Sequence, residues 1–265
     1  MSEYAESYNL DQNGPTTGDA FGAALIACSK IESADAIVGF SERDDGLLTP
    51  TTVSRYFEVD EWEREFLAAI RVNGPVLDVG SGAGRHIQLF QNRSDALVAL
   101  DPSRLALQLC KDRIPECACV EGVLDEGTVK RLGEEYGGFA LILLLGNNLG
   151  LLGWQAEAPE TVRLLGRALL PGGVIVGSTS AAPAVLSEVN RQHAEKNRLM
   201  GRSLRDVTTR FRYGNLATRW YNYSYYDETD LYRLFEDNGF TVNDLSFNGR
   251  RILVSAHLKD NDAAR

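Results

Sequence analysis

The stretch that decides the fold is Val76-Leu77-Asp78-Val79-Gly80-Ser81-Gly82-Ala83-Gly84-Arg85-His86. Its first residues form a short apolar run, which is typical of a buried parallel strand. The glycine-rich turn that follows allows positive φ and lets a ligand approach without meeting a Cβ atom. A helical pattern runs from Arg85 to Gln91, and the start of a helix presents unpaired N–H groups. The stretch therefore predicts a ligand-binding strand, turn and helix.

The spacing of the glycines separates two kinds of nucleotide-binding turn. A dinucleotide-binding loop has the pattern G-x-G-x-x-G/A, with a small residue in the sixth place. Here the sixth place holds Arg85, and the third glycine comes one residue early, at Gly84. The turn is thus G-x-G-x-G, with Asp78 two places before the first glycine. This form resembles the loop of class I S-adenosylmethionine-dependent methyltransferases.

Further landmarks follow in the order that this family shows. An apolar run ends at Asp101, 21 positions after Gly80, where a carboxylate would bind the ribose diol. Residues 119–124 stand where the third strand of the family meets the adenine. Residues 139–145 are a fourth apolar run, and 169–173 introduce a fifth. The resemblance covers about residues 75–180, together with the C-terminal strands.

The resemblance implies a set of contacts for S-adenosylmethionine. The turn, held by Asp78, would approach the methionine and ribose by its backbone at Gly80, Ser81, Gly82 and Gly84. The Asp101 carboxylate would hold the ribose hydroxyls. The adenine would be bordered by Pro102, Ser103, Gly122, Val123 and Leu124. The floor near the sulfonium would be formed by Leu145, Gly146 and Asn147. Tyr56 would touch the methionine part, or would serve in hydrophobic packing alone.

One position departs from the family. The family often has an acid at the place of Val123, where it accepts a hydrogen bond from the adenine amino group. The backbone N–H of Val123 can still reach an adenine nitrogen, and Asp125 lies two residues further on. The adenine contacts are therefore defined less sharply by the sequence than the ribose contacts.

For the methyl acceptor, the sequence offers Asn148, Arg219 and Tyr221. Asn148 follows the fourth apolar run, where N- and O-methyltransferases hold the acceptor. The motif N/D-P-P-Y/F of nucleic-acid and amino-group methylation is not present there. No catalytic residue is assigned, because the histidines lack motif context, and His86 is expected to be a partly buried structural residue. The methyl donor is already activated, so the family needs no metal, and positioning and desolvation supply most of the rate.

Arg219 and Tyr221 belong to a basic stretch. Residues 181–226 hold eight basic and three acidic side chains, whereas the whole chain carries a net charge of −10. Two interpretations stay open: these cations pair with the acidic body, or some of them face an anionic substrate. The acidic balance of the chain argues against a nucleic-acid partner.

From residue 74 onward, apolar strands alternate with amphipathic helices, which predicts an α/β fold with a parallel, doubly wound sheet. The resemblance implies a Rossmann-like sheet of seven strands in the order 3-2-1-4-5-7-6. A terminal antiparallel hairpin is expected to turn at Asn248-Gly249.

The predicted organisation has five parts. It consists of a mobile tail (1–17), an N-terminal helical cap (18–73), a cofactor-binding core (74–180 with 228–259), an inserted helix-and-hairpin cap on the substrate side (181–227) and a frayed tail (260–265). Within the first cap, Thr49-Pro50-Thr51 is predicted to start a short helix, and Asp60 to cap a second one.

Composition narrows the class of protein. The chain has 265 residues and no apolar run of transmembrane length, so no membrane partner is predicted. No signal peptide is visible in the polar N-terminus. Cys117 and Cys119 are expected to point to opposite faces of a strand, so that no shared metal site is predicted. Reduced thiols in a cytoplasmic protein are expected instead.

Three functions remain open at this stage. The first is methyl transfer to nitrogen or oxygen of a small, possibly anionic, molecule, with the two caps closing over the acceptor. The second is an NAD(P)-dependent oxidoreductase, which Arg85 disfavours. The third is a non-catalytic cofactor-binding protein of the same fold, because fold alone does not determine function.

Overall fold

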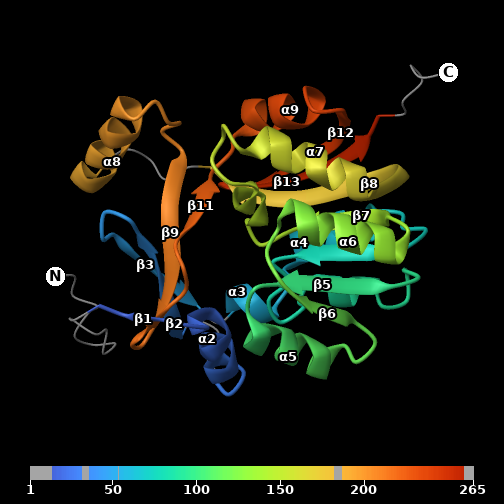
Figure 1. Cartoon of the computed structure of the whole chain (residues 1–265), viewed down its shortest axis with the longest axis horizontal. Helices are drawn as coiled ribbons and strands as arrows, with labels where there is room; N and C mark the ends of the chain where they lie inside the picture. The colour runs from blue at the N-terminus through green and yellow to red at the C-terminus, as the bar shows by residue number, and fades with distance from the viewer. Residues whose placement is uncertain (1–13, 32–35, 53, 182–186, 260–265) are drawn as a thin grey trace.

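The computed structural model describes residues 14–31, 36–52, 54–181 and 187–259 (Figure 1). The predicted C-terminal tail (260–265), and the part of the N-terminal tail before residue 14, lie outside the described residues. Among the described helices, none combines the length and apolar composition that a transmembrane span requires.

Within the described residues, seven strands form the larger of two sheets, in the order β12-β13-β8-β7-β4-β5-β6. The strands are β4 (Val76–Val79), β5 (Leu97–Asp101), β6 (Ala118–Glu121), β7 (Phe139–Leu144), β8 (Leu169–Ser180), β12 (Phe240–Asn248) and β13 (Arg251–Leu258). Adjacent strands from β8 to β6 are parallel, whereas β13 pairs antiparallel with β8 and with β12. Numbered in chain order, the sheet has the predicted order 3-2-1-4-5-7-6.

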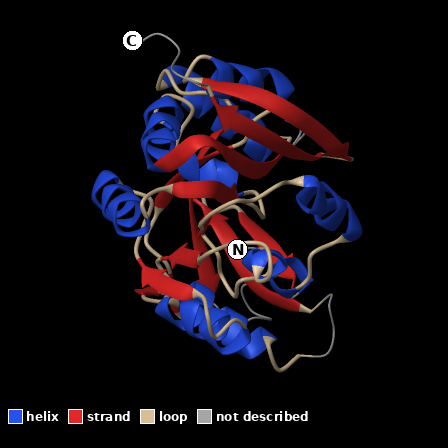
Figure 2. Ribbon diagram, turned by 90° about the vertical axis from the view of Figure 1, so that its right-hand side faces the viewer, coloured by secondary structure: helices blue, strands red, loops and turns tan. Residues whose placement is uncertain are grey.

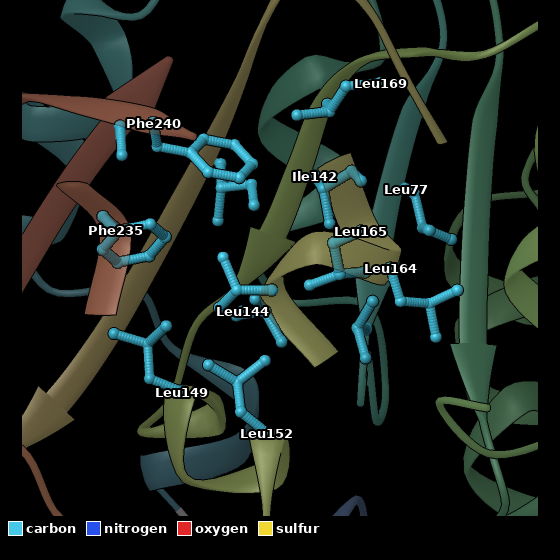
Figure 3. Close-up of a cluster of buried hydrophobic side chains, with 14 of the residues drawn as sticks. Leu77, Ile142, Leu144, Leu149, Leu152, Leu164, Leu165, Leu169, Phe235 and Phe240 are labelled. Carbon is cyan, nitrogen blue, oxygen red and sulfur yellow. The ribbon is translucent and has the colours of Figure 1, made fainter. Parts of the chain in front are cut away.

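Helices cover both faces of this sheet. One face packs against α6 (Glu126–Tyr136), α7 (Ala158–Ala168) and α9 (Glu228–Glu236). The labelled core side chains of this face, such as Leu77, Ile142 and Phe235, converge in Figure 3. The other face packs against α4 (Glu61–Ala69), α5 (Arg104–Arg113) and the short 3-10 helix η1 (Ile87–Phe90). The doubly wound prediction is therefore confirmed.

Capping side chains define where several of these helices begin. Asp60, Ser103, Asp125 and Asp227 each accept a hydrogen bond from a backbone N–H in the first turn of α4, α5, α6 and α9. Such a cap satisfies one of the N–H groups that lack a partner within the helix. The predicted cap at Asp60 is confirmed.

The second sheet joins two distant segments of the chain. Its strands are β1 (Thr16–Thr17), β2 (Ile37–Arg43), β3 (Leu48–Thr52), β9 (Asp206–Tyr213), β10 (Leu216–Ala217) and β11 (Tyr221–Ser224). Strand β9 of the insert pairs with β2, β10 and β11, so the insert and the N-terminal segment share one sheet. Helices α2 (Ala20–Cys28), α3 (Ser54–Phe57) and α8 (Glu188–Leu199) complete these segments. Figure 2 shows the helices packed around the periphery of the strands.

Three local predictions were wrong. The segment 18–73 is not purely helical, because it holds strands β2 and β3 besides its helices, and β1 lies in the predicted tail. Thr49-Pro50-Thr51 lies within β3 rather than at a helix start. Proline is tolerated there because β3 is an edge strand, where an N–H group is not required. After Gly84, the helix expected from Arg85 to Gln91 is only the short 3-10 helix η1 (Ile87–Phe90), and turns follow it up to β5.

Side chains attach the insert to the large sheet. The Tyr223 hydroxyl donates a hydrogen bond of 2.7 Å to the Asn147 carbonyl oxygen, at the start of the 3-10 helix η2 (Asn148–Leu152). The Tyr223 ring covers Gly150, where an added Cβ atom would lie 2.1 Å from a ring carbon. The Gln155 N–H donates to the Asp206 carboxylate at 2.9 Å, and Arg205 forms ion pairs with Asp227 and Asp230. The insert is therefore held in one position against the core.

We predict that Gly150→Ala lowers the free energy of unfolding by about 1–3 kcal/mol, because the new methyl group must displace the Tyr223 ring. The matched control is Gly133→Ala in α6, where the new Cβ would lie at an ordinary 3.6 Å from Ala168. That change should raise the free energy of unfolding by roughly 0.5–1 kcal/mol. Urea unfolding at equilibrium measures both values, and equal effects of the two substitutions would contradict the packing assigned to Tyr223.

Candidate functional site

A cavity of about 1920 Å³ lies between the two sheets. One wall consists of the carboxyl ends of the large sheet and the loops that follow β4, β5, β6 and β7. Ligands of open α/β sheets bind at this edge. A single small-molecule site usually measures about 300–1,000 Å³. The cavity therefore has room for a cofactor and a second ligand together.

The opposite wall is one face of the second sheet. Successive side chains of a strand alternate between the two faces, so every second residue faces the cavity. The cavity-facing residues are Ser41, Arg43, Thr49, Thr51, Val207, Thr209, Phe211, Tyr221 and Tyr223. On the outer face, Glu42 pairs with Arg210 at 2.7 Å and with Arg212 at 3.7 Å. The period-2 pattern thus places Thr209 and the aromatic residues of the hairpin towards the cavity, and Arg210 and Arg212 away from it.

The glycine turn at the end of β4 has the positive φ values that glycine tolerates. Gly80, Gly82 and Gly84 have φ of 69°, 54° and 77°. A Cβ atom at Gly80 would lie 2.5 Å from the Asn148 side chain, and one at Gly84 would lie 2.7 Å from the Cys110 sulfur. At Gly82 the nearest side chain, Phe21, is 3.7 Å away. Gly80 and Gly84 are therefore required for packing, whereas Gly82 leaves its backbone open to the cavity.

Asp101, at the end of β5, is tied to this turn. Its two carboxylate oxygens accept hydrogen bonds from the Gly82 N–H at 2.9 Å and the Ser103 N–H at 2.8 Å. Burial raises the pKa of Asp101 to about 6, although the two backbone hydrogen bonds oppose this shift and the nearby Asp19 adds to it. Each carboxylate oxygen can accept more than one hydrogen bond. Asp101 therefore keeps acceptor capacity at the cavity surface.

Two of the predicted site residues do not line the cavity. Asp78 lies beneath the turn, and its Oδ2 atom has no hydrogen-bond partner among the described residues. Burial raises its pKa to about 8, against the effect of the Arg85 guanidinium. Gly84 packs on α5, as described above. The other predicted residues all line the cavity, from Tyr56 through Ser103, Leu124 and Asn147 to Tyr221.

The two asparagines after β7 serve in positioning. Asn147 has a positive φ of 71°, and its N–H donates to the Ser178 hydroxyl at 2.9 Å. The Asn148 amide donates to the carbonyl oxygens of Val79 and Gly80, both at 2.9 Å. These bonds connect the loop after β7 with strands β4 and β8. The amide donors of Asn148 are therefore directed to the backbone and not to a ligand.

Asp19 joins two helices, a role that was not predicted from the sequence. Its carboxylate accepts hydrogen bonds from the Gly22 N–H at 2.9 Å, the Ser103 hydroxyl at 2.7 Å and the Leu105 N–H at 3.0 Å. These bonds join the starts of α2 and α5, which lie side by side (Figure 1). An acid just before a helical stretch predicts an N-cap, but its partners in a second helix have no sequence signal.

Glu63 pairs with His86 at the cavity wall, and this pair was not predicted from the sequence either. The His86 Nε2 atom lies 3.5 Å from the Glu63 carboxylate, and both side chains are buried. Arg251 of β13 lies 2.6 Å from the same carboxylate. Burial would raise the pKa of Glu63, but His86, Arg85 and Arg251 outweigh it and lower the pKa to about 2. Burial lowers the pKa of His86 to about 4, so an ionised carboxylate faces a neutral imidazole at neutral pH.

Aromatic rings from α2, α3 and β9 line one part of the cavity. The Phe21 ring contacts the Tyr56 ring edge to face at 5.1 Å between centroids, and the Phe211 ring at 5.5 Å. Tyr221 and Trp220 of the insert also line the cavity, and both are exposed. This region is suited to a ligand with a flat or apolar part.

Most cations of the insert are paired with acids. Ion pairs join Arg191 to Glu188, Lys196 to Asp44, Arg198 to Glu195, Arg205 to Asp227 and Asp230, and Arg210 and Arg212 to Glu42. Arg202 stacks on Trp154, with 3.8 Å between the guanidinium carbon and the ring centroid. Arg219 lines the cavity and makes no ion pair or hydrogen bond with the described part of the chain. In the described part of the insert, the interpretation of paired cations therefore holds except at Arg202, which stacks on a ring, and at Arg219, which faces the cavity.

The prediction that Cys117 and Cys119 point to opposite faces of a strand was wrong. The sulfur atoms of Cys110, Cys117 and Cys119 all lie within 4.8 Å of one another. Residues two apart on an extended chain point to the same face, so Cys117 and Cys119 converge instead of diverging. Cys110 reaches them from α5, which packs against β6.

The comparisons with known proteins agree with this geometry. The family described as "Methyltransferase domain" matches residues 55–245. No functionally curated protein matches the chain. A structure of a SAM-dependent methyltransferase from Bacteroides fragilis in complex with S-adenosyl-L-homocysteine has 21% sequence identity and a TM-score of 0.68, and covers 94% of this chain and 100% of that chain. Since so much of the chain is covered, the shared fold extends beyond the seven-stranded sheet.

Two further structures share less of the chain. The CcbJ methyltransferase from Streptomyces caelestis has 14% identity and a TM-score of 0.51, and covers 73% of this chain and 92% of that chain. A SAM-dependent methyltransferase from Methanosarcina mazei has 12% identity and a TM-score of 0.52, and covers 77% of this chain and 99% of that chain. At these identities the comparisons show the fold.

We predict that His86 makes stability depend on pH between about 6.5 and 4. In this window the unfolded chain binds a proton at this position that the folded protein does not bind, so the free energy of unfolding falls as the pH falls. From pH 7.5 to pH 5, the free energy of unfolding of the wild type should fall by roughly 2 kcal/mol more than that of His86→Asn, which lacks the titrating group. Urea unfolding at both pH values checks this. His257→Asn, a partly exposed residue of β13, is the control, and parallel pH profiles of wild type and His86→Asn would contradict the assignment.

Proposed function

The chain belongs to the class I S-adenosylmethionine-dependent methyltransferase family, and we propose that it methylates a nitrogen or oxygen atom of a small molecule bound beneath the second sheet. The observation that carries this proposal is the cavity of about 1920 Å³ between the glycine turn and the second sheet. S-adenosylmethionine, when bound, supplies an activated methyl group. The residues of the chain then have to bind the cofactor and the acceptor, orient them towards each other and exclude water.

The cofactor half of the cavity fits a nucleoside. Asp101 retains acceptor capacity for the ribose hydroxyls, and Gly82 presents an open stretch of backbone beside it. Gly122, Val123 and Leu124 line the cavity after β6 and would border the adenine, with Pro102 and Ser103 on the other side. Asp125 caps α6 by accepting from the Thr128 N–H at 2.7 Å with one oxygen, and it lines the cavity, so its second oxygen would be available to the adenine amino group. Tyr56, Leu145, Gly146 and Asn147 would enclose the methionine part.

The acceptor half of the cavity lies under the second sheet. Tyr221 and the neighbouring aromatic rings would hold a flat or apolar part of the acceptor. Arg219 would bind an anionic group, because it lines the cavity and makes no ion pair in the described part of the chain, whereas Arg202 lies outside the cavity lining and stacks on Trp154. We place the acceptor side in residues 181–227 together with β2 and β3, and the cofactor-binding core in 74–180 with 228–259.

The mechanism proposed is positioning and desolvation without a metal. The cavity walls bring two ligands together, and the apolar and aromatic lining removes water from the reacting groups. His86, neutral at pH 7 and held against Glu63, lies beside Gly146, where an added Cβ would be 3.8 Å from its Cε1 atom. It is the candidate to accept a hydrogen bond from the acceptor. The free cysteines fit the proposed cytoplasmic location.

The test of the cofactor is calorimetric titration with S-adenosylmethionine, S-adenosylhomocysteine and NADH in parallel. The sulfur nucleotides should bind and NADH should not. Asp101→Ala should weaken their binding by about 1–3 kcal/mol, through loss of charged hydrogen bonds. Wild-type affinity should also fall as the pH drops below about 6, because protonation of Asp101 replaces an acceptor with a donor.

The matched control is Asp112→Ala, which removes an exposed acid of α5 and should leave binding unchanged. Binding of NADH alone would overturn the proposal in favour of an oxidoreductase. Binding of the sulfur nucleotides without turnover of any acceptor would favour a non-catalytic cofactor-binding protein.

The acceptor is tested by screening small carboxylated and phosphorylated nucleophiles for methyl transfer. For an acceptor so found, Arg219→Gln should raise KM about 10-fold or more, because one charge-assisted hydrogen bond is lost, and should change kcat less. The matched control is Arg202→Gln from the same insert, because the Arg202 guanidinium stacks on Trp154. Acceptors that are exclusively uncharged, or an unchanged KM in Arg219→Gln, would refute the proposal that Arg219 binds an anionic group of the acceptor.

A further inference from the structure

Three thiols converge at the edge of the large sheet, outside the cavity. Cys110 lies in the last turns of α5, while Cys117 and Cys119 lie immediately before and within the edge strand β6. Cys110 and Cys117 are fully buried, and Cys119 is partly exposed. None of the three is among the residues that line the cavity. The cluster is therefore distinct from the proposed methyltransferase site.

The spacing of the sulfurs suits one metal ion. Sulfur ligands bind Zn²⁺ at about 2.3 Å, which places three sulfurs of one ion roughly 3.8–4.0 Å apart. The sulfurs here lie within 4.8 Å of one another, so closure needs a movement of about 1 Å or less in side chains. Thiolate ligands select soft ions such as Zn²⁺ and Cu⁺ over Mg²⁺ and Ca²⁺.

Two cations adjoin the thiols. The Lys111 ammonium donates a hydrogen bond of 2.9 Å to the Cys117 carbonyl oxygen, and its charge acts on Cys119. The Arg113 guanidinium acts on Cys110, and its buried NH1 atom has no hydrogen-bond partner in the described part of the chain. Three thiolates with one divalent ion carry a charge of −1. The partly buried Arg113 guanidinium, whose NH1 atom lacks a partner in the described part of the chain, would compensate that charge.

The Cys110 and Cys119 thiols are protonated at neutral pH when no ion is bound. Contact with Cys117 and burial raise the pKa of Cys110 far above its ordinary value, and burial raises the pKa of Cys119 to about 11. Binding of an ion must therefore release protons, because thiolates are the ligands.

We propose that Cys110, Cys117 and Cys119 bind one soft metal ion of the Zn²⁺ or Cu⁺ type through three thiolates. The partly exposed side at Cys119 leaves the remaining coordination position open to a solvent or exogenous ligand. This inference is independent of the proposed function, since it uses no residue of the cavity.

The test uses the full-length protein, reduced with a phosphine and freed of metal by a chelator. Titration with Cd²⁺, a spectroscopic substitute for Zn²⁺, should give thiolate-to-metal charge-transfer absorption that saturates at one ion per chain. In weak buffer at pH 7, binding should release at least two protons, from Cys110 and Cys119. Zn²⁺ added afterwards should displace the Cd²⁺ signal.

Cys119→Ser is the decisive variant, because the side chain is partly exposed and the substitution is small. It should weaken Cd²⁺ binding at least 10-fold and retain affinity for S-adenosylhomocysteine, which shows that it is folded. Cys28→Ser, a buried cysteine from α2, is the matched control and should leave Cd²⁺ binding unchanged. Release of fewer than two protons, wild-type affinity in Cys119→Ser, or loss of binding in Cys28→Ser would each overturn the proposal.

Discussion

The hydrogen bonds that converge on Asp101 are the interaction on which the site depends. Because its two oxygens accept from Gly82 and Ser103, one side chain joins the turn after β4 to the segment that opens α5. Asp19 adds α2 to the same junction through Ser103 and Leu105. Three elements from different parts of the chain are therefore fixed around one buried carboxylate. The energetic cost of that burial is visible in its raised pKa, and a ligand that donates hydrogen bonds would offset it.

The large sheet could be predicted from the sequence because its signals are local. The parallel strands are short apolar runs, and β5, β6 and β7 are followed by capped or amphipathic helices. The second sheet could not be predicted in the same way. Strand β2 is stabilised by pairing with β9, and Phe40 and Arg212, which lie opposite each other, are far apart in the sequence. A polar segment with Pro50 carries no strand signal of its own, so the pairing partner decides its structure.

The residues of the site divide along the same line. The glycine turn, Asp101 and the loop after β7 were identified because their spacing follows the strands that carry them. Glu63 was missed because its chemistry appears only when α4 brings it against His86 and Arg251, which come from two other elements. The cations of the insert show the reverse case. Their number suggested a basic surface for an anionic ligand, but most of them are paired with acids, several of them distant in sequence. Among the described residues of the insert, Arg219 is the cation that lines the cavity without an ion pair.

Gly84 connects the two sites inferred here. Its third-glycine position is required by packing rather than by ligand approach, because a side chain there would collide with the Cys110 sulfur. The cofactor turn therefore rests directly on one of the three thiols. Protein interiors are close-packed, so a shift of the Cys110 side chain is transmitted to the backbone that it touches. An ion held by the three thiols would fix that sulfur and, with it, the support of the turn. The third glycine of the turn is thus also the point of contact between the cofactor turn and the thiol cluster.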